Sequence, residues 1–163
     1  MHDFPDYAYV PGGPWPHPTR GKGHAPARPD PIREQDWALS GDYLRGVALF
    51  NAGYYWEAHE VWEGLWHAHG RSGPTADLLK ALIKLAAAGV KVRERQPRGA
   101  ATHARRAAEL LERVTEQAGG KRLGLDLRAL TSVAREIAAN PPDDPGERSA
   151  RVTRVFMFRF VPE

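Results

Sequence analysis

The sequence predicts an all-α protein, a single helical bundle of four to five helices with an irregular, Pro/Gly-rich N-terminal arm. Two observations lead to this prediction. Between residues 35 and 139, apolar residues recur at intervals of three and four, the spacing that places them on one face of a helix. Glycine and proline separate these segments by short connections, which favours antiparallel neighbouring helices.

Five helices are predicted from the apolar spacing and from the residues that end helices. They cover residues 35–51, 54–69, 75–95, 99–118 and, from 125 or 126, to 139. The apolar face of the first consists of Leu39, Tyr43, Val47 and Phe50. The third is apolar over most of its circumference, so we expect it at the centre of the bundle, with Thr75 or Ser72 as its cap.

The chain is expected to divide into an arm over residues 1–33, a bundle over residues 34–140 and a tail over residues 141–163. In the tail, valine and phenylalanine alternate with arginine and methionine, which predicts a short extended segment. The arm is too rich in proline for a helix or a central strand. Its aromatic residues favour an arm packed on the bundle over a flexible leader; they are Phe4, Tyr7, Tyr9 and Trp15.

Composition excludes several kinds of site. The 163 residues contain no cysteine, which excludes disulfides, thiolate zinc sites, cysteine nucleophiles and iron–sulfur clusters. The N-terminus has no basic start or apolar run, and no window approaches about 18 apolar residues, so we expect a cytoplasmic protein with no membrane partner. A net charge of +3 makes nucleic acid an unfavoured partner, because a nucleic-acid footprint is usually denser. A homo-oligomer remains open.

The segment 54–69 is the most informative because it combines tryptophan, histidine and glutamate. On a helical wheel its core-facing stripe contains Tyr54, Ala58, Val61, Leu65 and Ala68. The flank of this stripe contains Tyr55, Trp62 and Trp66. Next to the flank is a titratable row at intervals of four, His59, Glu63 and His67, with Glu60 and Trp56 beside it.

Histidine and carboxylate four residues apart share one helix face and can chelate one metal ion. His59 with Glu63 has this spacing, and so has Glu63 with His67, but about 12 Å of helical rise prevents the two histidines from sharing an ion. Further ligands must come from elsewhere, with His17 and His24 as the main candidates and His69 and His103 as weaker ones. The string His-Glu-Val-Trp-Glu at 59–63 departs from the zinc-protease pattern H-E-x-x-H at its last position, which removes the specific part of that motif.

Several interpretations of this helix remain open. The preferred one is a module that binds a small ligand or a protein at the His59/Glu63/Trp66 face, with the arm as part of the wall. The alternatives are a metal-dependent, hydrolase-like enzyme that uses His59, Glu60 and Glu63, a nucleic-acid adaptor, or a purely structural role. The candidate ligand-binding residues are His59, Glu60, Trp62, Glu63, Trp66, Lys84, His17 and His24. The candidate cofactor is a divalent metal, with His59, Glu63 and His67 as candidate ligands and one His–Glu pair at a time on the ion.

Residues 49–66, Leu-Phe-Asn-Ala-Gly-Tyr-Tyr-Trp-Glu-Ala-His-Glu-Val-Trp-Glu-Gly-Leu-Trp, resemble the signature of domain-of-unknown-function family 309. Residues 82–86 and 98–100 extend the resemblance, which covers about residues 43–130. It implies a small all-α bundle and no established activity. Lys84 stands where the family pattern has glutamine, which puts in doubt a site that needs a neutral amide there. The Pro-His-Pro element at 16–18 and the Gly-His element at 23–24 resemble an extension of one subgroup.

Overall fold

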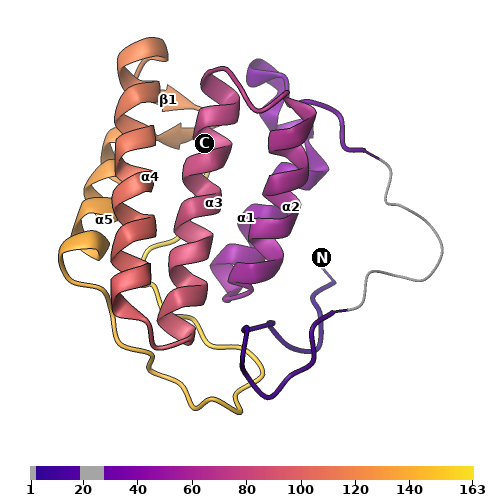
Figure 1. Ribbon diagram of the computed structural model, residues 1–163. Coiled ribbons are helices and arrows are strands. Elements are labelled where there is room, and N and C mark those ends of the chain that lie inside the picture. The colour runs from indigo at the N-terminus through magenta and orange to yellow at the C-terminus, as the bar shows by residue number, and fades with distance from the viewer. Residues whose placement is uncertain (1–2, 19–27) are drawn as a thin grey trace.

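The computed structural model describes residues 3–18 and 28–163 and is mostly helical (Figure 1). Over these residues, a 3-10 helix η1 (Glu34–Leu39) precedes five α-helices: α1 (Gly41–Ala52), α2 (Tyr55–Ala68), α3 (Pro74–Arg93), α4 (Pro97–Ala118) and α5 (Leu127–Ala139). A short antiparallel hairpin, β1 (Lys121–Arg122) and β2 (Leu125–Asp126), connects α4 to α5. The predicted all-α bundle is confirmed.

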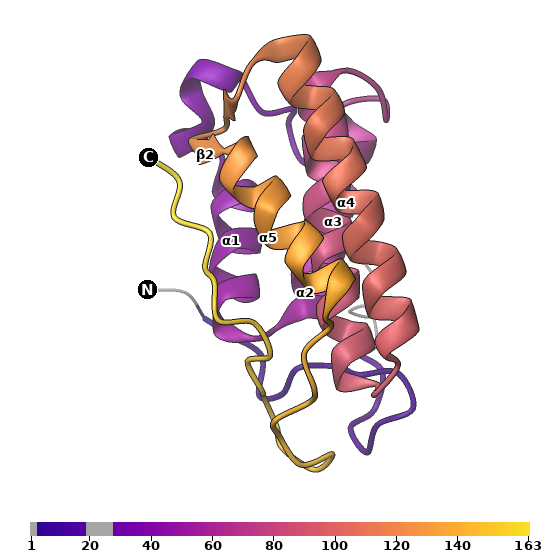
Figure 2. The same cartoon turned by 90° about the vertical axis from the view of Figure 1, so that its left-hand side faces the viewer.

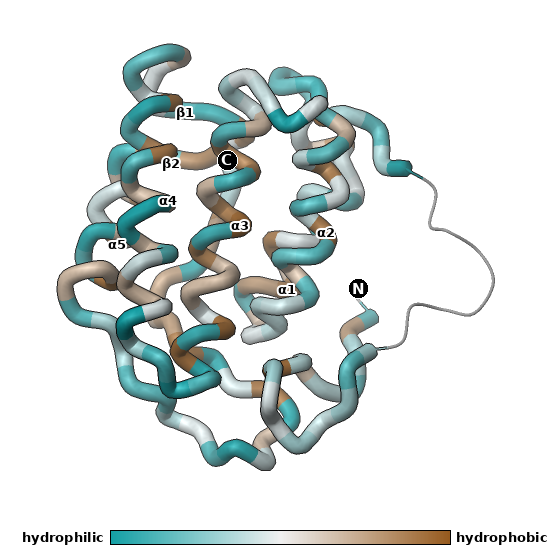
Figure 3. Tube along the Cα trace, in the orientation of Figure 1, coloured by the Kyte–Doolittle hydropathy of each residue, from teal (hydrophilic) through white to brown (hydrophobic). Residues whose placement is uncertain are grey.

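Helix α3 is the centre of the bundle, as the sequence predicts. It lies between α2 and α4, while α1 packs on α2 and α5 packs on α4. Figure 2 shows that α2, α3 and α4 form one layer and that α1 and α5 both lie on the same side of this layer. Figure 3 shows hydrophobic segments along α3 and a mainly hydrophilic outer side of α4. The α2–α3–α4 layer therefore has one side toward the core and one side free of α1 and α5.

Two glycines allow aromatic side chains of α2 to reach the backbone of neighbouring helices. A Cβ atom at Gly89 in α3 would lie 2.6 Å from the Tyr55 ring. A Cβ atom at Gly46 in α1 would overlap the Trp62 indole. Both aromatic residues are buried, so the glycines at positions 46 and 89 determine how closely α2 packs on α1 and α3.

The predicted helix over residues 35–51 is wrong as a single element. Ser40 has an extended conformation, and its hydroxyl accepts a hydrogen bond from the backbone N–H of Tyr43 at 3.3 Å. It therefore caps α1 and separates it from η1. As a result Leu39, which was expected on the apolar face, is 83% exposed.

The predicted caps of the third helix are also wrong. The helix begins at Pro74 after Gly73, which provides no side-chain hydrogen bond, so neither Ser72 nor Thr75 caps it. Proline at the first helical position needs no hydrogen-bond partner for its nitrogen, and its fixed φ suits the first turn.

The tail from residue 152 runs beside α1 without forming a regular strand (Figure 2). Phe156 and Phe160 are buried, whereas Met157 is 99% exposed. The side-chain amide of Asn51 accepts from the N–H of Phe160 at 2.9 Å and donates to its carbonyl at 2.8 Å. The hydroxyl of Tyr55 accepts from the N–H of Val155 at 2.9 Å. Side chains of α1 and α2 thus take the place of a partner strand.

The described part of the arm contacts both α2 and the tail. The backbone N–H of Tyr9 donates to the Glu57 carboxylate at 3.0 Å. The N–H of Ala8 donates to the carbonyl of Arg151 at 2.7 Å. In the described ranges, 3–18 and 28–163, no helix has the length and apolar character required to cross a bilayer.

Candidate metal and ligand site

Helix α2 has a buried side and a partly exposed side. Ala58, Trp62 and Leu65 have no exposed surface, whereas Val61 and Ala68 are only partly buried. The core stripe is therefore centred nearer to Trp62 than the helical wheel predicted. Trp62 packs on Gly46 of α1, and its indole N–H points to the carbonyl of Tyr43 at 3.4 Å. It is a core residue and cannot meet a ligand that arrives from solvent.

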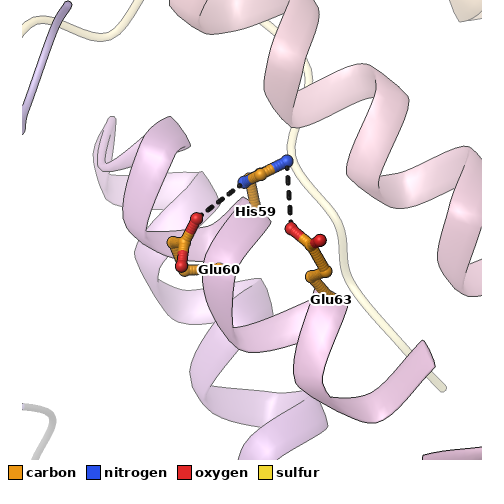
Figure 4. A group of neighbouring side chains, drawn as sticks. All are labelled: His59, Glu60 and Glu63. Carbon is orange, nitrogen blue, oxygen red and sulfur yellow. Dashed lines mark ion pairs between the residues drawn. The ribbon is translucent and has the colours of Figure 1, made fainter. Parts of the chain in front are cut away.

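The partly exposed side brings His59, Glu60 and Glu63 together (Figure 4). The Nδ1 atom of His59 lies 3.5 Å from a carboxylate oxygen of Glu60, and its Nε2 atom lies 3.5 Å from one of Glu63. One donor atom from each residue lies within 4.8 Å of the other two. The side chains are 28%, 35% and 40% exposed, so the group is open to solvent.

The two nitrogens of His59 have different surroundings. Nδ1 is buried and makes no hydrogen bond within the described part of the chain. Its 3.5 Å contact with Glu60 is longer than an ordinary N–H···O hydrogen bond. An ion that arrives from solvent therefore meets Nε2 and Glu63, while Glu60 lies on the other nitrogen. A carboxylate on the second nitrogen of a histidine ligand orients the ring and raises its basicity.

His67 does not join His59 in one group. Its Nε2 atom lies 3.8 Å from the second carboxylate oxygen of Glu63, and its side chain is 55% exposed. Glu63 thus stands between the two histidines, as their spacing along the helix requires. Of the predicted metal set, His59 and Glu63 converge, Glu60 joins them, and His67 contacts Glu63 alone.

Trp66 lies where α2 faces α3, next to a lysine of α3. The Nζ atom of Lys80 lies 4.1 Å from the centre of the Trp66 ring, a cation–π contact. Lys84 is one helical turn further along α3. Burial lowers its pKa, and the positive charges of Lys80 and Arg106 lower it further.

His103 of α4 belongs to the same surface and was only a weaker candidate in the sequence. Burial lowers its pKa first, followed by the charges of Lys84 and Lys91 and by the neighbouring His59. These effects require His103 to be within electrostatic reach of groups on both α2 and α3. Its place beside the buried Ala100, Ala104 and Ala107 on the apolar side of α4 is the sequence signal that could have identified it.

The histidines of the arm have separate positions. The His17 ring lies against Trp56 at 5.2 Å between centroids, one turn before Glu60 on α2. Its Nδ1 atom is 2.8 Å from the carbonyl of Pro18, which can only accept, so the ring donates there. His17 therefore lies at the start of α2 and not in the His59 group. His24 lies outside the described residues.

His69 at the end of α2 has a structural role. Its Nε2 atom accepts a hydrogen bond from the backbone N–H of Ile32 at 2.9 Å, which attaches the last residues of the arm to α2. Burial lowers the pKa of His69, so the neutral ring that this bond needs is favoured. His69 is therefore occupied and is not a ligand candidate.

The fold is that of a small all-α bundle, and its second helix presents histidine and glutamate at the surface. Residues 43–103 match the family model described as a domain of unknown function (DUF309). This is the family whose signature residues 49–66 resemble, so the match agrees with the resemblance seen in the sequence over the segment from α1 to the start of α4. The match ends in α4, before the expected limit near residue 130. No curated protein matches the chain.

Proposed function

We propose that the protein is a small-ligand-binding module whose ligand is a divalent metal ion on α2. His59 provides Nε2, Glu63 provides a carboxylate oxygen, and Glu60 orients the imidazole from the other nitrogen. The supporting observation is that donor atoms of these three residues lie within 4.8 Å of one another on one helix. Imidazole with carboxylate suits Zn²⁺ and Mn²⁺ among the common divalent ions, and open coordination positions are filled by water or a second ligand.

The shape of the surface favours an ion over a larger organic ligand. The described hollow next to Trp56, about 10 Å³ in volume, has room for about one water molecule. A wider hollow of about 520 Å³ lies at the hairpin end of the bundle, where Lys121 and Asp126 line it. Neither hollow includes His59 or Glu63. Drug-sized ligands usually occupy enclosed clefts of about 300–1,000 Å³, whereas a metal ion needs only converging donor atoms.

A metal-dependent enzyme is the second candidate. A metal ion with open positions can bind a water molecule and lower its pKa toward neutrality. The nearby Lys84 and His103 favour this candidate, because they offer a positive charge and a hydrogen-bond donor next to the ion.

The cysteine-free composition suits a reducing compartment, and on this basis we propose that the module works in the cytoplasm.

The test is a metal titration of the full chain purified without a histidine tag. Mn²⁺ binding is measured by electron paramagnetic resonance and Zn²⁺ binding by competition with a coloured chelator. We expect about one equivalent of metal, with affinity lowered about 10–100-fold by His59→Gln or Glu63→Gln. His67→Gln is the matched control and should change the affinity much less. Less than about 0.1 equivalent, with no affinity on titration, would refute the proposed site.

A further inference from the structure

Positive charge is concentrated on α3 and α4 next to the His59 group. Lys80 and Lys84 are four residues apart, so they lie on the same face of α3. His103 and Arg106 face them from α4. The Lys91 side chain lies against Gly99, and two turns away along these antiparallel helices Lys84 comes opposite Arg106 and next to His103. The mutual pKa effects of these groups agree with this arrangement. We call Lys80, Lys84, His103 and Arg106 the cationic strip.

The charge of Lys84 is not neutralised. In the part of the chain that the structure describes, Lys84 forms no ion pair, and the groups that shift its pKa after burial are both positive. Lys80 contacts the Trp66 ring instead of a carboxylate. Arg106 is paired, with Glu109 at 3.2 Å. Like charges that share a partly buried surface repel one another, and a bound anion relieves this repulsion.

His103 adds a directional donor rather than a further charge. Burial lowers the pKa of His103 first, and the charges of Lys84 and Lys91 and the neighbouring His59 lower it further, so the neutral ring is favoured. A neutral imidazole carries one N–H that can donate a hydrogen bond. The strip therefore offers an ammonium group from α3 and an imidazole N–H from α4. An oxyanion can accept a hydrogen bond from both groups at the same time.

We propose that the cationic strip binds a small oxyanion, a phosphate ion or phosphate ester, between Lys84 and His103 and beside the metal on His59 and Glu63. This inference rests on the proposed function and names the second ligand of the same site. Without a metal, Glu60 and Glu63 would repel an anion, whereas a bound divalent ion offsets their charge. Metal and oxyanion should therefore strengthen each other's binding by the same factor.

A small anion fits the strip better than a nucleic acid. Packed helices are about 8–10 Å apart, so side chains on α3 and α4 can enclose one phosphate group between them. A nucleic acid presents a row of phosphates and is bound by a longer series of cations. Here the series is interrupted by carboxylates, at Glu94 beside Lys91 and at Glu109 beside Arg106.

The experiment measures inorganic phosphate binding to the Mn²⁺-loaded full chain by ³¹P relaxation, which the paramagnetic ion enhances only at short range. We expect enhanced relaxation with the wild-type chain and a phosphate affinity at least about tenfold weaker in Lys84→Gln. Lys84→Arg keeps the charge and should keep most of the affinity. Lys121→Gln removes one exposed lysine at the hairpin and should leave the affinity unchanged.

Parallel measurements separate the two proposals. Mn²⁺ affinity without phosphate should be the same in Lys84→Gln and wild type. If Mn²⁺ binds but phosphate relaxation is not enhanced, or if Lys121→Gln weakens phosphate as much as Lys84→Gln, the oxyanion inference is refuted and the metal site stands.

If Mn²⁺ does not bind, the proposed function fails, and the anion site is judged on the metal-free chain. A phosphate-dependent shift of the His103 NMR signals, lost in Lys84→Gln, would support it, and no shift would refute it. Binding of a single-stranded oligonucleotide that displaces phosphate and weakens steeply with salt would refute the small-anion inference in favour of nucleic acid.

Discussion

The two sides of α2 have different neighbours and different chemistry. On one side, Tyr55 and Trp62 are buried against glycines of α3 and α1, where no additional atom fits. On the other side, His59 and Glu63 keep part of their surface in solvent and contact each other at 3.5 Å. The buried side contributes dispersion and apolar burial, while exposed ion pairs contribute only about 0–1 kcal/mol each. The fold thus depends on one side and leaves the other available for binding.

The largest expected effect tests this division with two tryptophans of the same helix. Trp62→Ala leaves a cavity in the core and should lower the free energy of unfolding by about 3–5 kcal/mol. Trp66→Ala removes a partly buried ring under Lys80 and should cost clearly less. Chemical denaturation of both variants measures the difference. Equal losses would show that the two sides of α2 support the fold alike.

Two glycine substitutions sharpen the comparison. Gly89→Ala places a methyl group against the Tyr55 ring and should lower the free energy of unfolding by about 1–3 kcal/mol. At Gly64 the same methyl group would lie 3.7 Å from Pro29, an ordinary contact. Gly64→Ala should therefore raise stability by about 0.5–1 kcal/mol through helix propensity. A stable Gly89→Ala variant would mean that the contact between α2 and α3 can relax.

Two glutamates one turn apart provide the next test. Glu57 is buried and accepts the N–H of Tyr9, so Glu57→Ala leaves that group without its partner and should cost about 1–3 kcal/mol. Glu60→Ala, on the partly exposed side, should change the unfolding free energy of the metal-free chain by less than about 1 kcal/mol. Thermal and chemical unfolding measure both values. A large loss for Glu60→Ala would make that carboxylate a folding residue and remove it from the site.

The smallest expected effect is a pH dependence at the end of α2. Burial lowers the pKa of His69 in the folded chain below its ordinary value of 6.5. The unfolded chain therefore binds a proton first as the pH falls, so the stability from neutral His69 is complete above pH 6.5 and is lost between 6.5 and the lowered folded pKa. Unfolding measured from pH 7.5 to 5 should depend less on pH in His69→Gln, whose side-chain oxygen can still accept from Ile32. Identical pH profiles would contradict this role.

The sequence predicted the helices well because their apolar periodicity is a local property. It also predicted that His59 and Glu63 meet, because residues four apart lie side by side on any helix. It missed the break at Ser40, since the apolar residues on both sides of that break keep a helical interval. It also missed the hairpin, which depends on positive φ values at Leu123 and Gly124.

Contacts between distant segments were not accessible from the sequence. The helical wheel gives the direction of each side chain of α2 but not which helix lies opposite, so it could not show that Gly46 makes room for Trp62. The sequence could not predict the position of His103 beside Lys84 either, because this position depends on how α4 packs on α3. Spacing predicts pairs within a helix, while sites formed between helices require the packing itself.

The double hydrogen bond of Asn51 has a consequence for the alignment of the tail. One amide recognises both backbone groups of Phe160 and so selects that residue among its neighbours. In an extended chain, a slip by one position exchanges the inward and outward side chains. Such a slip would turn Met157 and Arg159 toward the core and expose phenylalanines to water. Asn51 therefore fixes the alignment of the tail. It determines that the phenylalanines face the core and that Met157 and Arg159 face solvent.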